Sequence, residues 1–167
     1  MNLPVFKKNK IYYDKRGFLG EIYRKKTQKK NYKFILFTSS KKNVFRGLHI
    51  QSACTQEKKI YLIKGKIFDI CIDLRKKSKT FRKIFKYLML PGDMLTIPRG
   101  FAHGYYTLGS ENILLYIMDN YQSKKNETGV TIFDKKFNFK FKNKRFVISK
   151  KDQNLPDLKS YIKIYCK

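Results

Sequence analysis

Apolar and polar positions alternate with a period of two along much of this 167-residue chain. Residues 60–63 are apolar, a turn follows at Lys64-Gly65-Lys66, and residues 67–74 then alternate between apolar and small or polar side chains. Successive side chains of a strand point to opposite faces, so this pattern predicts a β-hairpin. The same criterion predicts further strands over residues 81–90, 94–97, 103–108 and 112–120 and around Thr131.

Signals for helices are scarce and lie near the C-terminus. The tail from Ser149 onward contains Pro156, followed by Leu158 and Tyr161, and this spacing of apolar residues predicts one short helix. No linker, internal repeat or low-complexity segment divides the chain, so residues 1–167 are expected to form one domain. Many short strands separated by Gly and Pro favour a mainly β sandwich or barrel with one or a few short helices.

The two histidines of the chain lie in segments rich in glycine. His49 follows Gly47, and His103 lies between Gly100 and Gly104. Glycine permits tight turns and close approach of two backbones, while the apolar neighbours hold each segment in a core. We therefore expect the two segments to face each other across the mouth of a barrel, with both imidazoles directed into one cavity.

The second histidine segment has the spacing of a cupin motif. Its matching positions are Gly92, Pro98, Gly100 and His103. In metal-binding cupins the first motif supplies two histidines and a downstream Glu, whereas the first segment here reads His49-Ile50-Gln51 and has one imidazole. Glu57 remains as an oxygen donor, but Lys58 and Lys59 follow it, and cations beside a divalent metal are unfavourable. The sequence thus predicts no metal and no other cofactor.

The net charge of +27 raises the question of a nucleic-acid partner. The excess is mostly lysine spread along the chain, with abundant Asn, Ile, Phe and Tyr and no Trp, as an AT-rich coding sequence would give. We interpret the charge as a solvated lysine surface and expect no nucleic-acid partner. A positive field would still attract a small polyanion such as a nucleotide diphosphate.

The cysteines and the apolar runs indicate the compartment. Cys54, Cys71 and Cys166 are odd in number and fit neither a disulfide framework nor a close-spaced metal motif, so free thiols are expected. No apolar run approaches the roughly 20 residues of a membrane span, and residues 1–8 lack the apolar region of a signal peptide. These features predict a cytoplasmic protein without a membrane partner.

Several motifs follow one another in a fixed order. They are Asp14-x-Arg16-Gly17-x-x-x-Glu21, Arg46-Gly47-Leu48-His49-x-Gln51, Phe68-Asp69-Ile70-Cys71-Ile72-Asp73-Leu74-Arg75, Ile97-Pro98-x-Gly100-Phe101-Ala102-His103-Gly104, then Tyr116, Tyr121 and Ser149-x-Lys151-Asp152. In this order the chain resembles the dTDP-4-dehydrorhamnose 3,5-epimerase family. The resemblance implies a metal-independent homodimer with a cupin-type jelly-roll fold that inverts C3, C5 or both in a nucleotide-linked 4-keto-6-deoxy sugar. Such an isomerase would serve cell-surface polysaccharide or deoxysugar biosynthesis.

Inversion next to a ketone requires a base, an acid on the opposite face and a group that stabilises the enolate. The resemblance assigns the base to His49, whose unperturbed pKa near 6.5 suits proton removal at neutral pH. Asp152 would orient and support its imidazolium. Tyr116 would be the acid, and Lys59 would lie near the enolate oxygen, where a fixed cation stabilises the transition state.

The resemblance also implies a set of substrate-binding residues. Arg46 would contact the diphosphate, His103 the sugar or the enolate oxygen, and Tyr121 the sugar pocket. Further binding residues would be Gln51, Ser149 and Lys151, together with Arg16 and Glu21. The last two match residues that contact the nucleotide partly from the other subunit, which implies that the N-terminal segments of a dimer are exchanged.

Two departures from the family pattern lie in the N-terminal half of the chain. A Gln-x-Asn signature is common ahead of the residue that matches Arg46, whereas this chain reads Phe34-Ile35-Leu36-Phe37-Thr38-Ser39-Ser40. Leu19 stands where an aromatic residue is frequent. The catalytic set is complete, so the difference concerns the nucleotide pocket.

Three functions remain open from sequence. The first is a 3,5-epimerase or a relative that inverts one carbon or uses another nucleotide. The second is a 3,4-ketoisomerase, whose family carries a different histidine pattern and against which Tyr116 and Asp152 argue. The third is a sugar-binding cupin without turnover, which would not require a base, an acid and a lysine together.

Overall fold

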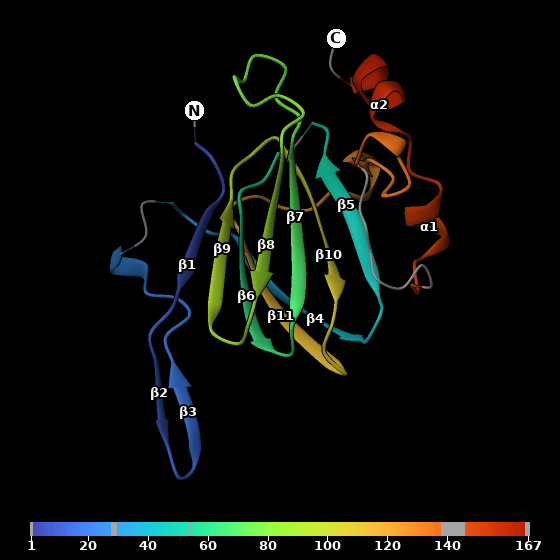
Figure 1. Ribbon diagram of the computed structural model, residues 1–167. Helices are drawn as coiled ribbons and strands as arrows, with labels where there is room; N and C mark the ends of the chain where they lie inside the picture. The colour runs from blue at the N-terminus through green and yellow to red at the C-terminus, as the bar shows by residue number, and fades with distance from the viewer. Residues whose placement is uncertain (1, 28–29, 54, 138–145, 166–167) are drawn as a thin grey trace.

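The computed structural model describes residues 2–27, 30–53, 55–137 and 146–165, which form two antiparallel five-stranded sheets and a separate hairpin (Figure 1). In spatial order the first sheet contains β1 (Val5–Lys8), β9 (Asp93–Ile97), β6 (Lys58–Lys64), β11 (Glu111–Met118) and β4 (Phe34–Lys41). The second contains β12 (Glu127–Gly129), β5 (Phe45–Gln51), β10 (Phe101–Thr107), β7 (Ile67–Asp73) and β8 (Ile84–Met89). The hairpin pairs β2 (Ile11–Asp14) with β3 (Gly17–Gly20).

Helical segments in the described part of the chain are short. They are the 3-10 turns η1 (Lys25–Thr27), η2 (Lys124–Asn126) and η3 (Lys135–Phe137) and the helices α1 (Lys150–Gln153) and α2 (Leu158–Tyr165). Both α-helices lie beside β5, far from the β2–β3 hairpin, which projects from the body (Figure 1). Within this part of the chain, no helix combines the length and apolar character needed to cross a membrane.

Most of the predicted strands are confirmed, with shifts at their ends. The hairpin around Gly65 forms as β6 and β7. The strands predicted over residues 94–97, 103–108 and 112–120 form as β9, β10 and β11. The strand expected from residue 81 begins at Ile84, and the one expected around Thr131 ends earlier, at Gly129. The predicted C-terminal helix is α2, whereas α1, β4 and the three N-terminal strands were not predicted.

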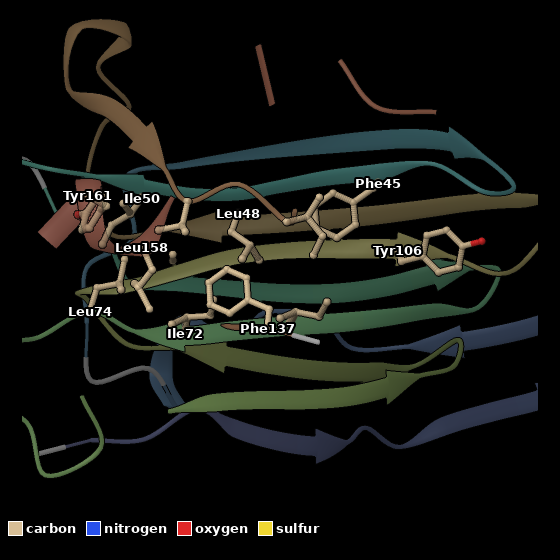
Figure 2. Packing of buried hydrophobic residues seen from close by; sticks show 13 residues of the cluster. Phe45, Leu48, Ile50, Ile72, Leu74, Tyr106, Phe137, Leu158 and Tyr161 are labelled. Carbon is tan, nitrogen blue, oxygen red and sulfur yellow. The ribbon is translucent and has the colours of Figure 1, made fainter. Parts of the chain in front are cut away.

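Two hydrophobic clusters lie on the two faces of the second sheet. One fills the space between the sheets and includes Ile60 and Leu114 from the first sheet and Cys71 and Tyr105 from the second. The other covers the outer face of the second sheet, where α2 and η3 pack on β5, β7 and β10 (Figure 2). Its labelled members are Phe45, Leu48, Ile50, Ile72, Leu74, Tyr106, Phe137, Leu158 and Tyr161. Because the C-terminal segment covers this face, the sheet is buried on both sides.

The carboxylate of Asp73 organises the turn between β7 and β8. It accepts hydrogen bonds from the Arg75 guanidinium at 2.7 and 2.8 Å, from Ser78 Oγ at 2.7 Å and from Thr80 Oγ1 at 2.6 Å. The Arg82 backbone N–H, in the left-handed region with φ of 67°, donates to the Asp73 carbonyl. These bonds close a compact turn, which explains why β8 begins later than the sequence predicts.

Asp73→Asn is expected to destabilise the fold in a pH-dependent manner. Burial acts to raise the pKa of Asp73, but the bonds from Arg75, Thr80 and Ser78 outweigh it and lower the pKa from 3.8 to about 2. Because the folded pKa is depressed, the carboxylate stabilises the fold above pH 3.8, by about 2 kcal/mol, and this contribution is lost as the pH falls toward 2. Urea unfolding of the parent and the variant should differ by about that amount at neutral pH and much less in acid. A difference that does not change with pH would contradict this role.

Candidate functional site

A register shift in β5 brings two functional side chains to the same face. His49 pairs with His103, but Arg46 pairs with Tyr105, so three residues of β5 span the distance covered by two residues of β10. Strict alternation would place Arg46 and His49 on opposite faces, whereas the shift directs both between the sheets. Gly47 has φ of +115° here, and a Cβ on it would lie 2.6 Å from Gly104 Cα. Glycine is therefore required where these strands approach closely.

A cavity of about 590 Å³ opens between the two sheets at this shift. Strand β5 contributes Arg46, His49 and Gln51 to its wall, and the C-terminal segment contributes Ser149, Lys151 and Asp152. The remaining residues with polar side chains are Thr38, Gln56, Lys58, His103, Tyr105, Tyr116, Gln122 and Glu127. His49 and His103 thus share one cavity, which confirms the arrangement expected from the two histidine segments.

His49 and Asp152 form a hydrogen-bonded pair at the cavity wall. His49 Nε2 lies 2.7 Å from Asp152 Oδ1, and the Gly47 N–H donates to Asp152 Oδ2 at 3.0 Å. Ser149 Oγ caps α1 by accepting from the Asp152 N–H. Burial acts to raise the pKa of Asp152, but the bonds from His49, Gly47 and Ser149 outweigh it and leave the pKa below 3.8. Asp152 is therefore ionised at neutral pH, so Nε2 carries a proton and Nδ1 is the basic nitrogen.

His103 has its own carboxylate partner. Its Nε2 lies 2.7 Å from Asp69 Oδ2, and both side chains are buried, at 4% and 0% exposure. The Cys71 thiol donates to the other Asp69 oxygen at 3.5 Å. The His103 and Tyr116 rings meet edge to face with centroids 6.2 Å apart. This second pair fixes the His103 imidazole beside the phenol of Tyr116.

Tyr116 projects from β11, in the sheet opposite the one that carries His49. Burial raises the pKa of Tyr116 well above 10, and the nearby Tyr105 and Asp69 raise it further. Tyr105 itself lies within hydrogen-bond distance of Thr38 Oγ1 at 3.1 Å and of Ser40 Oγ at 3.2 Å. The Tyr116 phenol therefore retains its proton until a reaction draws on it.

The lysine that faces the cavity is Lys58, one position before the Lys59 expected from sequence. Lys58 pairs with Met118 on the cavity face of β6, whereas Lys59 pairs with Ile117 on the outer face, with its Nζ 5.1 Å from the Tyr32 ring centroid. Lys58 lines the cavity and Lys59 does not, so the predicted position of Lys59 near the reacting atoms is wrong. Burial lowers the pKa of Lys58, while Cys71, Glu127 and Asp69 act to raise it.

The other expected binding residues fall into two groups. Arg46, Gln51, Ser149 and Lys151 line the cavity together with His103. Arg46 Nε donates to Ser40 Oγ at 3.0 Å, and Gln51 Oε1 accepts from the Ser123 N–H at 3.2 Å. Lys151 Nζ donates to Glu127 Oε2 at 2.6 Å.

Three expected residues lie away from the cavity within this chain. Tyr121 is 65% exposed, and its ring stacks on Phe34. Arg16 pairs with Asp14 at the tip of the β2–β3 hairpin, and Glu21 pairs with Arg24 just after that hairpin. Neither Arg16 nor Glu21 reaches the cavity of its own chain.

Sequence reasoning did not assign a site role to Lys58, Asp69, Tyr105 or Glu127. Asp69 had a signal, because a carboxylate in the apolar strand 67–74 needs a partner inside the barrel. Lys58 had a weaker one, since it lies on the same face of the strand as Ile60 and Leu62.

In the part of the chain that the structure describes, no group of three His, Cys, Asp or Glu side chains is placed to hold a metal. Metal independence stays a prediction. Cys71 is a buried free thiol as expected, while Cys54 and Cys166 lie outside the described residues.

Comparison with known proteins shows the family to which this chain is similar. Residues 4–160 match the family model of dTDP-4-dehydrorhamnose 3,5-epimerase. A dTDP-4-dehydrorhamnose 3,5-epimerase from Shigella flexneri is 34% identical over 154 residues, which cover 87% of this chain and 85% of that protein. The sequence-based prediction of an isomerase of this kind, acting on a nucleotide-linked sugar, is confirmed.

Two solved structures share the fold at appreciable identity. A dTDP-6-deoxy-D-glucose-3,5-epimerase from Legionella pneumophila, in complex with dTDP-4-keto-L-rhamnose, is 30% identical with a TM-score of 0.86, over 93% of this chain and 88% of the other. A dTDP-4-dehydrorhamnose 3,5-epimerase from Bacillus anthracis with TDP and pyrophosphate bound is 32% identical with a TM-score of 0.87, over 93% and 94%. The mainly β, cupin-type fold class is thereby confirmed.

Proposed function

The chain belongs to the dTDP-4-dehydrorhamnose 3,5-epimerase family, and from that membership we propose that it inverts C3 and C5 of a dTDP-linked 4-keto-6-deoxy sugar. The observation that carries the proposal is the pairing of His49 with Asp152 on one wall of the cavity, opposite the protonated phenol of Tyr116. A base and an acid on opposite walls match the two faces of a planar enolate. The product would serve deoxysugar biosynthesis.

The reaction begins with proton removal by His49. Its Nδ1 takes the proton from the carbon next to the C4 ketone, and the electron pair of the C–H bond moves into an enolate. The ionised Asp152 stabilises the resulting imidazolium through Nε2. Tyr116 then delivers its phenolic proton to the other face of the same carbon, which inverts the centre and leaves a phenolate.

We propose that two groups stabilise the enolate oxygen. Lys58 lies on the cavity face in a buried setting, where Glu127 and Asp69 favour its charged form against the effect of burial. As a cation it would stabilise the enolate strongly in such a setting. His103 supplies a ring that Asp69 holds in a fixed orientation beside Tyr116. Their positions support a pose in which the ketone lies between β6 and β10.

The nucleotide diphosphate would occupy the cationic part of the cavity. Arg46 is an exposed residue there, and Lys151 extends from α1 with 54% of its side chain exposed. The Legionella and Bacillus relatives hold dTDP-4-keto-L-rhamnose and TDP respectively. We therefore propose thymidine diphosphate as the carrier. Leu36 and Thr38, in the segment that departs from the family pattern, line the same cavity.

The test is incubation of the protein with nucleotide-linked 4-keto-6-deoxy sugars in deuterium oxide. The proposal expects deuterium at C3 and C5 of the dTDP sugar and inverted configuration at both carbons, as read by NMR. Deuterium and inversion at one carbon would reduce the proposal to a mono-epimerase. Movement of the ketone to C3 would indicate a ketoisomerase, and binding without deuterium uptake would indicate a sugar-binding cupin.

We also propose a homodimer formed through the outer face of the first sheet. Ile35 and Phe37 on β4 are 57% and 74% exposed on that face, and such an apolar patch is unfavourable in water. Val5 on β1, at the opposite edge of the sheet, is 60% exposed. A second copy would cover the patch isologously. It would also bring a β2–β3 hairpin, with Arg16 and Glu21 at or near it, toward the other cavity. This arrangement gives the two residues a site that their own chain does not provide.

Phe37→Asp is expected to convert the dimer to a monomer, because it places a charge within the proposed interface. Sedimentation velocity of the parent and the variant measures the change. Leu88→Asp, at a 48% exposed position on the second sheet, is the matched control and should leave the mass unchanged. A parent protein that sediments as a monomer would contradict the proposal.

A cytoplasmic location is proposed as well, since the free thiol of Cys71 suits a reducing compartment.

A further inference from the structure

The proposed chemistry leaves the enzyme with protons in the wrong places after each inversion. His49 has gained the proton that left the substrate, and Tyr116 has lost the proton that entered it. A second inversion, or a second turnover, requires His49 to lose a proton to water and Tyr116 to regain one from water. The following inference rests on the proposed function and concerns the route by which His49 is reset.

The His49 ring has one nitrogen available for that route. Asp152 occupies Nε2 at 2.7 Å, and it is itself held by the Gly47 N–H and by the cap of α1. On the opposite side of the ring, Nδ1 lies 3.9 Å from Glu127 Oε1. That separation exceeds a direct hydrogen bond by about 1 Å, so a small rotation of the glutamate would connect the two groups.

Glu127 connects the interior of the cavity with solvent. It lies on β12, which pairs with β5 so that Gly129 opposes His49 and Glu127 opposes Gln51. Its side chain is 14% exposed, against 5% for Asp152. Its second oxygen, Oε2, accepts from Lys151 Nζ, and the Lys151 side chain is 54% exposed at the rim. One carboxylate oxygen therefore faces the base while the other is held by a cation at the surface.

We propose that Glu127 is the proton exit of the active site. The proton on His49 Nδ1 passes to Glu127 Oε1, the N–H bonding pair returns to the imidazole, and the carboxylic acid then releases the proton to water. Water returns one proton to the Tyr116 phenolate, so each inversion exchanges one proton with solvent in each direction. Lys151 holds Glu127 near His49 and stabilises the carboxylate when it re-forms. Glu127 is thus a positioning and relay residue that acts through His49.

Glu127→Gln keeps the shape of the side chain but cannot carry the proton. In rapid-quench experiments with the dTDP-linked 4-keto sugar, the first cleavage of a C–H bond should stay within about threefold of the parent rate, because His49 and Asp152 are intact. Steady-state turnover should fall by about tenfold or more, and product inverted at a single carbon should accumulate, since His49 must be reset between inversions. Added 4-methylimidazole should restore turnover, because a small buffer can accept the proton in place of Glu127.

Two variants control the result. Glu111→Gln removes a carboxylate from a comparable pair with Lys64, 2.7 Å long and outside the cavity, and should leave all rates and the buffer dependence at the parent values. Glu127→Asp retains a carboxylate and should recover part of the steady-state rate without added buffer. Thermal unfolding of each variant reports whether the fold is retained.

Distinct outcomes separate this inference from the proposed function. Equal steady-state rates for the parent and Glu127→Gln at low buffer would overturn the proton exit. So would an equal loss in the first turnover and the steady state that 4-methylimidazole does not restore, because that pattern indicates a structural role. If Glu127→Gln does not fold, a reduced steady-state rate of Glu127→Asp that added 4-methylimidazole does not raise would overturn it as well. A parent protein that exchanges no substrate hydrogen overturns the proposed function itself.

Discussion

His49→Ala is expected to abolish both deuterium exchange and inversion, with a fall in rate of about a thousandfold or more. Its imidazole is paired with the ionised Asp152 at 2.7 Å, which leaves Nδ1 as the basic nitrogen. The Arg46 guanidinium, also in the cavity, stays protonated at neutral pH and cannot act as the base. NMR of the substrate in deuterium oxide measures exchange and inversion in one sample.

Asp152→Asn serves as the companion to His49→Ala. It preserves the shape of the side chain but removes the charge that supports the imidazolium, so the rate should fall strongly while substrate binding changes little. Calorimetric titration with dTDP, a ligand that cannot react, would measure binding separately. Full deuterium exchange in His49→Ala would show that another group is the base.

The second large effect is expected for Lys58→Met. Removal of a fixed cation from a buried site that develops negative charge costs about a hundredfold to a thousandfold in rate. Methionine has nearly the same length and no charge, so packing against Met118 is retained. The steady-state rate constant kcat should fall by this factor.

Lys59→Met is the matched control, since it removes the same charge from the adjacent residue. Lys59 lies on the outer face of β6 and does not line the cavity, so its replacement should change kcat by less than about twofold. Assay of both variants at one ionic strength compares them directly. A larger loss in Lys59→Met than in Lys58→Met would return the enolate-stabilising role to the position expected from sequence.

The fold was largely predictable because the period-two alternation reports burial directly. β6, β7, β9, β10 and β11 all carry apolar residues on the face that enters the cluster between the sheets. The first sheet also contains β1 and β4, which were not predicted. Their alternation is weak because Val5, Ile35 and Phe37 are apolar on the outer face as well. The amphipathic signal is lost where both faces of a strand are apolar.

The site was less predictable because it depends on register between strands distant in sequence. His49 and Arg46 share a face through the shift opposite Gly104, which spacing along β5 alone does not indicate. The choice between Lys58 and Lys59 depends on which of them pairs with the cavity face of β11. Lys59 was chosen by its spacing from His49, but the loop after β5 lies between the two residues. The length of that loop does not determine which side chains of β6 face the cavity.

The central claim is that base and acid act on opposite faces of the substrate, and Tyr116→Phe tests it most directly. The variant keeps the buried ring and its contact with His103 but lacks the phenolic proton. In deuterium oxide, His49 should still remove the substrate hydrogen and return deuterium to the same face. NMR should therefore find deuterium at C3 or C5 with the original configuration retained. Inversion at the parent rate would contradict the assignment of Tyr116 as the acid.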